Sequence, residues 1–431
     1  MNVLILGLGQ YPKGSGVSAA LHFAKAGDDV LATDLKTRDQ LKENVKQLSE
    51  YKNVKFRLGK HEAKDVDWAD LIVRGPSVRS DSKEMKLARK LGKAVTSDLA
   101  LFMESCPCPI VGVTGTRGKS TTTSMIYEIL SFSKKWRKVW LGGNILVSPL
   151  TFLSQVKKND IVVLEMSSFQ LEGTGDAGIS PQYAVWTNLM RDHLNAYPSM
   201  NEYAEAKAQI FRHQDADDFV FFPADKSFDE YAKEAAGNVV RVKQGKFNLA
   251  VPGEHNQMNA SFAAAMASKL GVPASKIKIA LKSFKGLSNR IETIAVKGAL
   301  TFINDTTATT PDGTLAALKS FKPSKHSIHL IFGGADKELD FVEIAAYLKR
   351  RKDVGVYLLA GTAHQKIETA FKKADICYLD VQDLEQVFNE LKLWTEKGDI
   401  VLLSPGCTSF GLFKNEFDRG EQFKKLVKKW K

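Results

Sequence analysis

A glycine-rich segment followed directly by lysine and serine is the clearest chemical signal in this sequence of 431 residues. The segment Pro109–Thr123 reads PIVGVTGTRGKSTTT: a short apolar run enters a turn, and a helical stretch follows. Gly115 and Gly118 carry no side chain, so backbone N–H groups can approach phosphate oxygens closely. Lys119 can place its charge on the β- and γ-phosphates, and the hydroxyl of Ser120 can bind Mg²⁺. The segment therefore predicts a loop that binds the phosphates of ATP.

A carboxylate and a histidine follow two further apolar runs. Glu165 ends the predicted strand Asp160–Leu164, and this position suits Mg²⁺ binding in a domain that carries a phosphate loop. His193 follows the predicted strand Tyr183–Thr187, and Lys207 lies downstream on a predicted helix. Taken singly, a glutamate at a strand end, a lone histidine and a helical lysine are more often solvated or structural. The residue types alone therefore leave their roles open.

These residues need a scaffold, and three segments of the chain alternate strand-like apolar runs with amphipathic helical stretches, a pattern typical of parallel α/β sheets. In the first and last segments, the predicted strands are Asn2–Leu6, Asp29–Thr33, Leu71–Val73, Leu300–Asn304, His329–Phe332, Gly355–Leu359 and Ile400–Leu403. The helices predicted in the first segment are Gly16–Ala26 and Lys83–Leu91. We therefore predict an α/β fold of three domains, residues 1–101, 102–292 and 293–431, with linkers near Cys106–Pro109 and Gly286–Asn289.

The composition is that of a globular protein, with 44% hydrophobic and 26% charged residues. No segment is apolar enough for a membrane span and the N-terminus lacks the features of a signal peptide, so we expect a cytoplasmic protein without membrane insertion. The net charge of +12 comes from lysines spread along the whole chain, which favours a solvated surface or phosphorylated small molecules over nucleic acid. The four cysteines form no Cys-x-x-Cys pair, so we expect reduced thiols.

The phosphate loop and two later motifs together resemble the Mur ligase family. The loop matches T-G-T-x-G-K-S-T-T-T, with Arg117 where members usually carry asparagine, a position expected to contribute mainly backbone. EMSSFQLE from Glu165 resembles the E-x-S-S-F-Q-L of members that add glutamate, and NLMRDHLNAY from Asn188 resembles N-x-x-x-D-H-x-x-x-Y. The resemblance implies that Lys207 is carbamylated. The catalytic residues that it implies are Lys119, His193 and Lys207. The implied Mg²⁺ ligands are Ser120, Glu165, His193 and Lys207.

Two downstream motifs extend the resemblance to the adenine side of ATP and to the junction with the last domain. GEHNQMNA begins at Gly253, and GLSNRIE begins at Gly286. The ATP-binding residues that the resemblance implies are Gly115, Thr116, Gly118, Lys119, Ser120, Thr121, Asn256, Asn259, Arg290 and Asp305.

The two ends of the chain resemble the Rossmann-like domains that flank the P-loop ATPase-type parallel sheet in this family. GLGQYPKGSG near the N-terminus matches a domain that holds UDP, and NDTTATT, GGADK and LSPGCTSF match the domain for the incoming amino acid. Thr307 stands where the family has a lysine that helps to bind glutamate, so one cation is missing. The implied substrate-binding residues are Asp34, Thr37, Asn144, Ser167, Gln170, Thr307, Lys337 and Ser409.

The resemblance covers nearly the whole chain. It implies a monomeric enzyme that uses ATP and Mg²⁺ to add D-glutamate to UDP-N-acetylmuramoyl-L-alanine through an acyl phosphate, giving ADP and phosphate in peptidoglycan precursor synthesis. Addition of L-glutamate, a folylpolyglutamate-type synthetase and a non-catalytic nucleotide-binding protein stay open as alternatives. A Rossmann oxidoreductase would explain the N-terminal glycines but would leave the Gly-Lys-Ser loop without a role.

Overall fold

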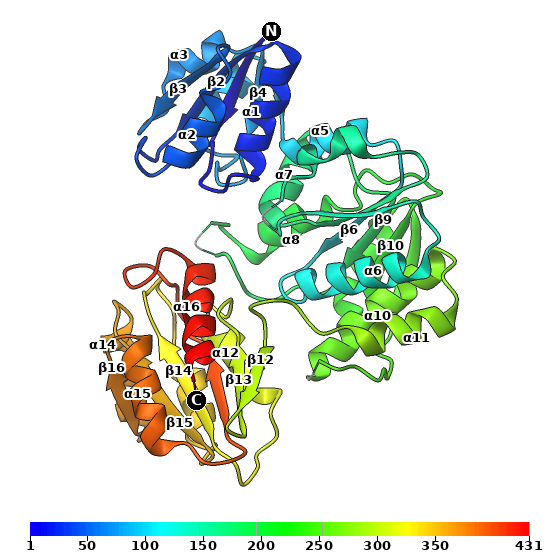
Figure 1. Cartoon of the computed structure of the whole chain (residues 1–431). Coiled ribbons are helices and arrows are strands. Elements are labelled where there is room, and N and C mark those ends of the chain that lie inside the picture. The colour runs from blue at the N-terminus through cyan, green and yellow to red at the C-terminus, as the bar shows by residue number, and fades with distance from the viewer. Residues whose placement is uncertain (146, 195, 252, 431) are drawn as a thin grey trace. The chain divides into compact units, whose positions relative to one another are not determined.

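The computed structural model describes residues 1–145, 147–194, 196–251 and 253–430. It is an α/β protein with three sheets, flanked by helices (Figure 1). The strands and helices predicted from the sequence are present, with ends that differ by at most one residue. The predicted fold class is therefore confirmed.

The first sheet has five parallel strands in the order β3-β2-β1-β4-β5. Its strands are β1 (Asn2–Leu6), β2 (Asp29–Asp34), β3 (Val54–Leu58), β4 (Leu71–Arg74) and β5 (Ala94–Thr96). Its helices are α1 (Ser15–Ala26), α2 (Lys42–Leu48), α3 (Ala63–Trp68), α4 (Lys83–Lys90) and α5 (Asp98–Ser105). β1 is central because nearly its whole length is apolar and buried, as a strand covered on both faces requires.

The second sheet has six parallel strands in the order β11-β10-β9-β6-β8-β7. Its strands are β6 (Ile110–Thr114), β7 (Val139–Gly143), β8 (Ile161–Glu165), β9 (Tyr183–Trp186), β10 (Phe219–Pro223) and β11 (Asn238–Val242). Its α-helices are α6 (Lys119–Ser133), α7 (Ser168–Asp176), α8 (Met200–Ala208), α9 (Asp229–Glu234), α10 (Glu254–Lys269) and α11 (Ala274–Ser283). β6 lies between β8 and β9, so the loop after it is bordered by the ends of both neighbours.

The third sheet has the order β12-β13-β17-β14-β15-β16 and is parallel except for its edge strand β12. Its strands are β12 (Glu292–Lys297), β13 (Leu300–Asn304), β14 (Ile328–Gly333), β15 (Val354–Leu359), β16 (Tyr378–Val381) and β17 (Ile400–Leu403). Its helices are α12 (Pro311–Lys319), α13 (Val342–Leu348), α14 (His364–Ala374), α15 (Leu384–Trp394) and α16 (Glu416–Lys429). Separate apolar clusters surround Phe332 and Phe302, as a sheet with helices on both faces requires.

The chain divides into two compact units. The first comprises Met1–Leu249 and His255–Phe284, and it contains the first two sheets. The second comprises Ala250–Glu254 and Lys285–Lys431, and it contains the third sheet. One apolar cluster in the first unit includes residues of both of its sheets, from Val3 to Phe228, which explains why they form a single unit.

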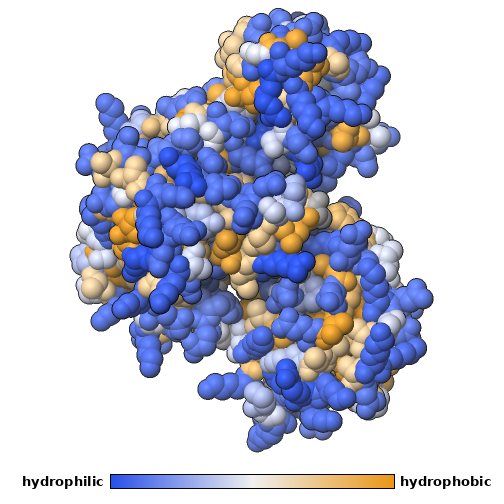
Figure 2. Space-filling view, turned by 180° about the vertical axis from the view of Figure 1, so that it is seen from behind, coloured by the Kyte–Doolittle hydropathy of each residue, from blue (hydrophilic) through white to orange (hydrophobic). Residues whose placement is uncertain are grey.

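The face of the molecule in Figure 2 is mostly hydrophilic, with hydrophobic residues in scattered patches. Across the described ranges, no helix is both long enough and apolar enough to cross a membrane.

Candidate active site

The phosphate loop joins the end of β6 to the start of α6. Gly118, at φ 79°, occupies the left-handed region, and a Cβ there would collide with the side-chain oxygen of Asn259. Gly115, at φ 146°, would collide in the same way with the hydroxyl of Thr187. Both positions therefore require glycine, and the loop leads into the N-terminus of a helix, where backbone N–H groups favour anions.

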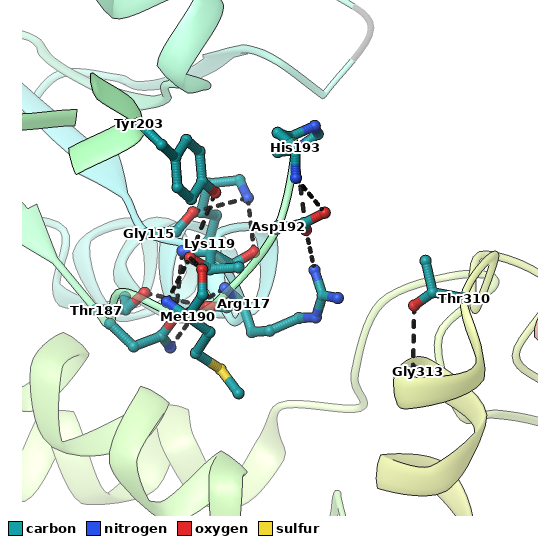
Figure 3. Close-up of polar contacts among 12 residues, drawn as sticks. Gly115, Arg117, Lys119, Thr187, Met190, Asp192, His193, Tyr203, Thr310 and Gly313 are labelled. Carbon is teal, nitrogen blue, oxygen red and sulfur yellow. Dashed lines mark hydrogen bonds and ion pairs between the residues drawn. The ribbon is translucent and has the colours of Figure 1, made fainter. Parts of the chain in front are cut away.

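Lys119 is the first residue of α6, and its side chain folds back over the loop. Its Nζ donates to the carbonyl oxygens of Gly115 at 3.0 Å and Thr116 at 3.1 Å (Figure 3). The charge is therefore held beside the loop in which the sequence predicts phosphate binding.

The segment after β9 fastens the loop from the other side. The Asn188 side-chain oxygen accepts from the N–H groups of Thr116 at 3.1 Å and Arg117 at 2.9 Å. The Thr187 hydroxyl and the Asn188 amide both donate to the Arg117 carbonyl, at 2.7 Å and 3.0 Å. These paired contacts hold the loop backbone in one conformation.

Arg117 contributes more than backbone, which the sequence had not indicated. Its guanidinium forms an ion pair with Asp192 at 2.7 Å (Figure 3). The other oxygen of Asp192 accepts from the N–H of His193 at 2.8 Å, and His193 has a left-handed φ of 56°. Burial would raise the pKa of Asp192, but the charges of His193 and Arg117 lower it below its usual value. Arg117 thus ties the phosphate loop to the residue beside His193.

Lys207 lies on α8 and is only 1% exposed. Its Nζ donates to the Gly115 carbonyl at 2.9 Å, the same oxygen that Lys119 contacts. Burial and the nearby Lys119 charge lower its pKa to about 6. The amine is therefore mostly uncharged at neutral pH, the form in which an amine can react with CO₂.

Tyr203 links Lys207 to His193. The Lys207 Nζ is 4.5 Å from the Tyr203 ring centre, and the ring centres of Tyr203 and His193 are 5.6 Å apart. The Tyr203 hydroxyl donates to Thr116 Oγ1 at 3.3 Å. The fold therefore brings Lys119, His193 and Lys207 to the same end of the second sheet.

Glu165 ends β8 next to the end of β6 and is 2% exposed. One carboxylate oxygen accepts from the Asn144 amide at 2.8 Å, whereas the other is buried without a hydrogen-bond partner. A buried carboxylate oxygen of this kind is costly unless a cation compensates it, and Mg²⁺ prefers such oxygen ligands. The parts of the chain that the structure describes hold no group of three or more His, Cys, Asp or Glu arranged for a metal. Ser120, whose hydroxyl the sequence predicts as a ligand, lies at the start of α6.

A cavity of about 270 Å³ lies where the glycine-rich loop after β1 meets the loop after β7. Among its lining residues, those that bear on substrate binding are Gly7, Gly9, Lys36, Asn144 and Gln170. A second cavity of about 450 Å³ is lined by five carboxylates and a single arginine. A diphosphate is an anion, so the first cavity suits it better.

Asp34 and Thr37, which the sequence predicts to contact the nucleotide of the substrate, form hydrogen bonds within their own segment and to the loop after β1. Asp34 accepts the N–H groups of Gly9 at 2.8 Å and Lys36 at 2.9 Å, so its carboxylate shapes the loop. Thr37 is exposed and hydrogen-bonds Gln40. Of this segment, Lys36 lines the cavity. The sequence analysis missed Lys36, although a cation beside Asp34 was a usable signal.

Ser167 and Gln170 form a capping box at the start of α7. The Ser167 hydroxyl accepts from the Gln170 N–H at 3.2 Å, and the Gln170 side-chain oxygen accepts from the Ser167 N–H at 3.1 Å. The S-S-F-Q motif therefore fixes the helix start, and it leaves Gln170 at the edge of the cavity.

α10 supplies the predicted adenine-side residues. Thr122 of α6 donates to the side-chain oxygen of Asn259 at 3.3 Å, and the Asn259 amide donates to Asn256 at 3.2 Å. Because Asn259 also packs against Gly118, this helix is held directly beside the phosphate loop.

In the second compact unit, three loops at the carboxyl ends of β13, β14 and β17 form what we call the C-terminal loop cluster, residues 304–310, 333–337 and 404–409. Ala335 and Thr408 exchange backbone hydrogen bonds at 2.9 and 3.2 Å, so exposed Lys337 and buried Ser409 lie on adjoining loops. Arg419 is fully buried behind them. It donates to the carbonyls of Thr306 at 2.9 Å and Cys407 at 3.3 Å, and burial lowers its pKa to about 10.

Asp305 and Thr307 face the junction after α11. Asp305 accepts from the Ser404 hydroxyl at 2.7 Å and from the Ile291 N–H at 3.2 Å, and burial raises its pKa to about 7. The Thr307 hydroxyl donates to the Asn289 carbonyl at 2.9 Å. Arg290, within this junction, is exposed. Thr307 therefore uses its one donor on the chain itself.

Comparisons with known proteins identify the family of this chain. Residues 113–244 match the Mur ligase middle domain, and residues 289–407 match the Mur ligase, glutamate ligase domain. The UDP-N-acetylmuramoylalanine–D-glutamate ligase of Roseiflexus sp. (strain RS-1) is 35% identical, over 98% of this chain and 97% of that protein. The enzyme of the same name from Borreliella afzelii (strain PKo) is 34% identical over 99% and 97%.

Solved structures share the fold. The UDP-N-acetylmuramate–alanine ligase of Thermotoga maritima has a TM-score of 0.64 at 22% identity and covers all of both chains. A second ligase from Thermotoga maritima, MurF in complex with ADP, has a TM-score of 0.62 at 16% identity, over 99% of this chain and 98% of that one. With curated relatives at 35% and 34% identity along nearly its full length, the chain belongs to the Mur ligase family.

Proposed function

We propose that this protein is an ATP-dependent ligase that adds D-glutamate to UDP-N-acetylmuramoyl-L-alanine in peptidoglycan precursor synthesis. The observation that carries the proposal is the convergence of Lys119 and Lys207 on the Gly115 carbonyl. It puts a fixed cation and a second, largely uncharged lysine on one phosphate loop. The relatives named for D-glutamate addition support the choice of this amino acid over L-glutamate, and of this ligase over a folylpolyglutamate-type synthetase.

ATP binds along the phosphate loop in this proposal. The N–H groups at the start of α6 and the charge of Lys119 stabilise the negative charge that develops as the γ-phosphate moves to the alanine carboxylate. Asn256, Asn259, Arg290 and Asp305 are the residues proposed for the rest of the nucleotide. The product of this step is an acyl phosphate with a good leaving group.

The residues around Glu165 fit a magnesium site. Ser120, Glu165, His193 and the carbamate of Lys207 would hold Mg²⁺, which neutralises phosphate charge when bound. The uncharged Lys207 amine attacks CO₂ to form an N–C bond and loses a proton. The resulting carbamate turns a buried, mostly uncharged amine into an anion beside the loop.

The cavity between the loops after β1 and β7 is the proposed place for the UDP-linked substrate. Asn144 and Gln170 line it with neutral donors, and Lys36 supplies a cation. Asp34 and Thr37 contribute to substrate binding indirectly, because their hydrogen bonds shape the loop that carries Lys36.

The C-terminal loop cluster is the proposed site of the amino acid. Lys337 and Ser409 hold its side-chain carboxylate, and the amine attacks the acyl carbon so that phosphate leaves. Thr307 is the weakest member of this set, because its hydroxyl already donates to Asn289. We further propose a monomeric, cytoplasmic enzyme whose three domains divide at residues 101 and 292.

A ligation assay tests the proposal. The full chain is incubated with ATP, Mg²⁺ and UDP-N-acetylmuramoyl-L-alanine, and D-glutamate, L-glutamate, L-lysine or diaminopimelate is added separately. Phosphate release and a new amide product are expected with D-glutamate. Preference for L-glutamate would overturn the stereochemical assignment, and preference for a diamino acid would overturn the glutamate assignment.

A further inference from the structure

Two thiols meet in the segment that joins α5 to β6. Cys106 and Cys108 flank Pro107, and their sulfur atoms are 3.8 Å apart. Cys106 is half-buried and Cys108 is 6% exposed. The backbone at Cys106 is extended, with φ −72° and ψ 120°. Residues two apart in an extended segment point to the same side, which brings the two sulfurs into contact.

The two thiols are not equivalent. A hydrogen bond from Cys108 stabilises the Cys106 thiolate and lowers the pKa of Cys106, and the same contact raises the pKa of Cys108. Cys106 is also the more accessible of the two. The thiolate is the reactive form of cysteine, so Cys106 is the attacking group and Cys108 is the resolving one.

We propose that Cys106 and Cys108 form a reversible dithiol–disulfide site that hydroperoxides oxidise. The Cys106 thiolate attacks the terminal oxygen of the hydroperoxide and the O–O bond breaks. A sulfenic acid forms, and an alkoxide leaves, which is hydroxide when the oxidant is hydrogen peroxide. The Cys108 sulfur then displaces the sulfenic oxygen as water, which forms the S–S bond. The two sulfurs together lose two electrons and the peroxide gains them. An external dithiol reverses the reaction by exchange.

The geometry requires only a local adjustment. A disulfide needs a sulfur separation of about 2 Å, so side-chain rotation at the two residues supplies most of the approach from 3.8 Å. The bridge would close a ring across Pro107, immediately before the strand that ends in the phosphate loop. This site is independent of the proposed ligase function.

The other two cysteines provide internal controls. Cys377 is exposed, and Cys407 is buried with a pKa that burial raises to about 12. Cys377 should therefore react with alkylating reagents without forming an internal bridge, and Cys407 should react slowly until the protein unfolds.

The test is hydrogen peroxide treatment of the full chain, followed by iodoacetamide under denaturing conditions, intact mass and peptide mapping. The expected result is the loss of two hydrogens, two fewer alkylated thiols, and a linked peptide containing Cys106 and Cys108, all reversed by dithiothreitol. Cys377→Ser should behave in the same way, whereas Cys106→Ser and Cys108→Ser should not form the linkage.

Three results would overturn the proposal. They are sulfinic acid at Cys106 without a linkage, disulfides that join two chains through Cys377, and unchanged mass at Cys106 and Cys108 while Cys377 is oxidised. Peptide mapping of the unsubstituted protein decides among these results, so the conclusion holds even if replacement of the buried Cys108 impairs folding.

Discussion

The phosphate loop and the C-terminal loop cluster both sit at the carboxyl ends of parallel strands, yet they use positive charge in opposite ways. Around the phosphate loop, Lys119 and Arg117 are only partly buried, and they lie at the rim of the site. In the C-terminal loop cluster, Arg419 is fully buried and donates to two backbone carbonyls. A motif cation near solvent can meet a ligand, whereas one whose donors are satisfied inside the protein serves as scaffold.

Replacement of Lys119 should have the largest effect on activity. Lys119→Ala removes a charge that is needed most in the transition state, so kcat should fall on the order of 10²–10³-fold while unfolding is unchanged. Phosphate release and urea unfolding measure the two quantities. Lys134→Ala, at the exposed far end of the same helix, is the control. Near-normal kcat in Lys119→Ala would show that this lysine has a structural role, like Arg419, and does not stabilise the transition state.

Lys207 is a buried lysine beside the phosphate loop, and we expect its amine to be carbamylated. Lys207→Ala should lose activity on the order of 10²-fold, with partial recovery on addition of short carboxylic acids that replace the missing anion. Because the folded pKa is about 6, the wild-type amine is protonated below that pH, and activity should fall as pH drops through it. Assays with and without bicarbonate test this. Full activity in the variant without carboxylate would contradict carbamylation.

Arg419→Gln tests the buried cation of the C-terminal loop cluster, whose replacement should lower the stability of the protein. The change removes charged donors to the carbonyls of Thr306 and Cys407, which stay buried. The free energy of unfolding of the C-terminal unit should fall by roughly 3 kcal/mol. Urea titration is the measurement, and Arg350→Gln, at an exposed arginine of the same unit, is the control. If the two variants unfold alike, Arg419 is not the scaffold cation described above.

Asp305 should give the smallest effect, one that depends on pH. Its folded pKa of about 7 lies above the ordinary value, so its contribution to stability is present at low pH and is lost as pH rises through 7. Between pH 5 and 8 the wild type should lose on the order of 1–2 kcal/mol relative to Asp305→Asn. The exposed Asp312→Asn should track the wild type. Parallel stability curves for wild type and Asp305→Asn would refute the assignment.

The sequence predicted what depends on local pattern. Buried parallel strands such as β1 and β6 are short apolar runs, and the glycines of the phosphate loop stand where the backbone needs them. The edge strand β12 was missed, because its residues are half-exposed and carry no continuous apolar run.

The sequence did not predict which side chains contact each other between segments that are far apart in the chain. The motifs suggest that Asp34 and Thr307 contact ligands. In the structure, Asp34 accepts a hydrogen bond from the Gly9 N–H, and the Thr307 hydroxyl donates to the Asn289 carbonyl. The only sequence signal for Lys36 was its place beside Asp34, and Arg117 carried none. The positions of both side chains depend on which loops the fold brings together. Such pairings are decided by tertiary contacts between segments far apart in the chain.

The attachment of residues 187–193 to the phosphate loop has a thermodynamic consequence. Asn188 and Asp192 both bond to the loop, and His193 follows directly, so a shift of the loop also moves His193. Suppose that occupancy of the loop by nucleotide strengthens the binding of a ligand at His193 by some factor. That ligand must then strengthen nucleotide binding by the same factor. Arg117 is where this coupling could be changed, because shortening its side chain would remove the ion pair with Asp192 that joins the two segments.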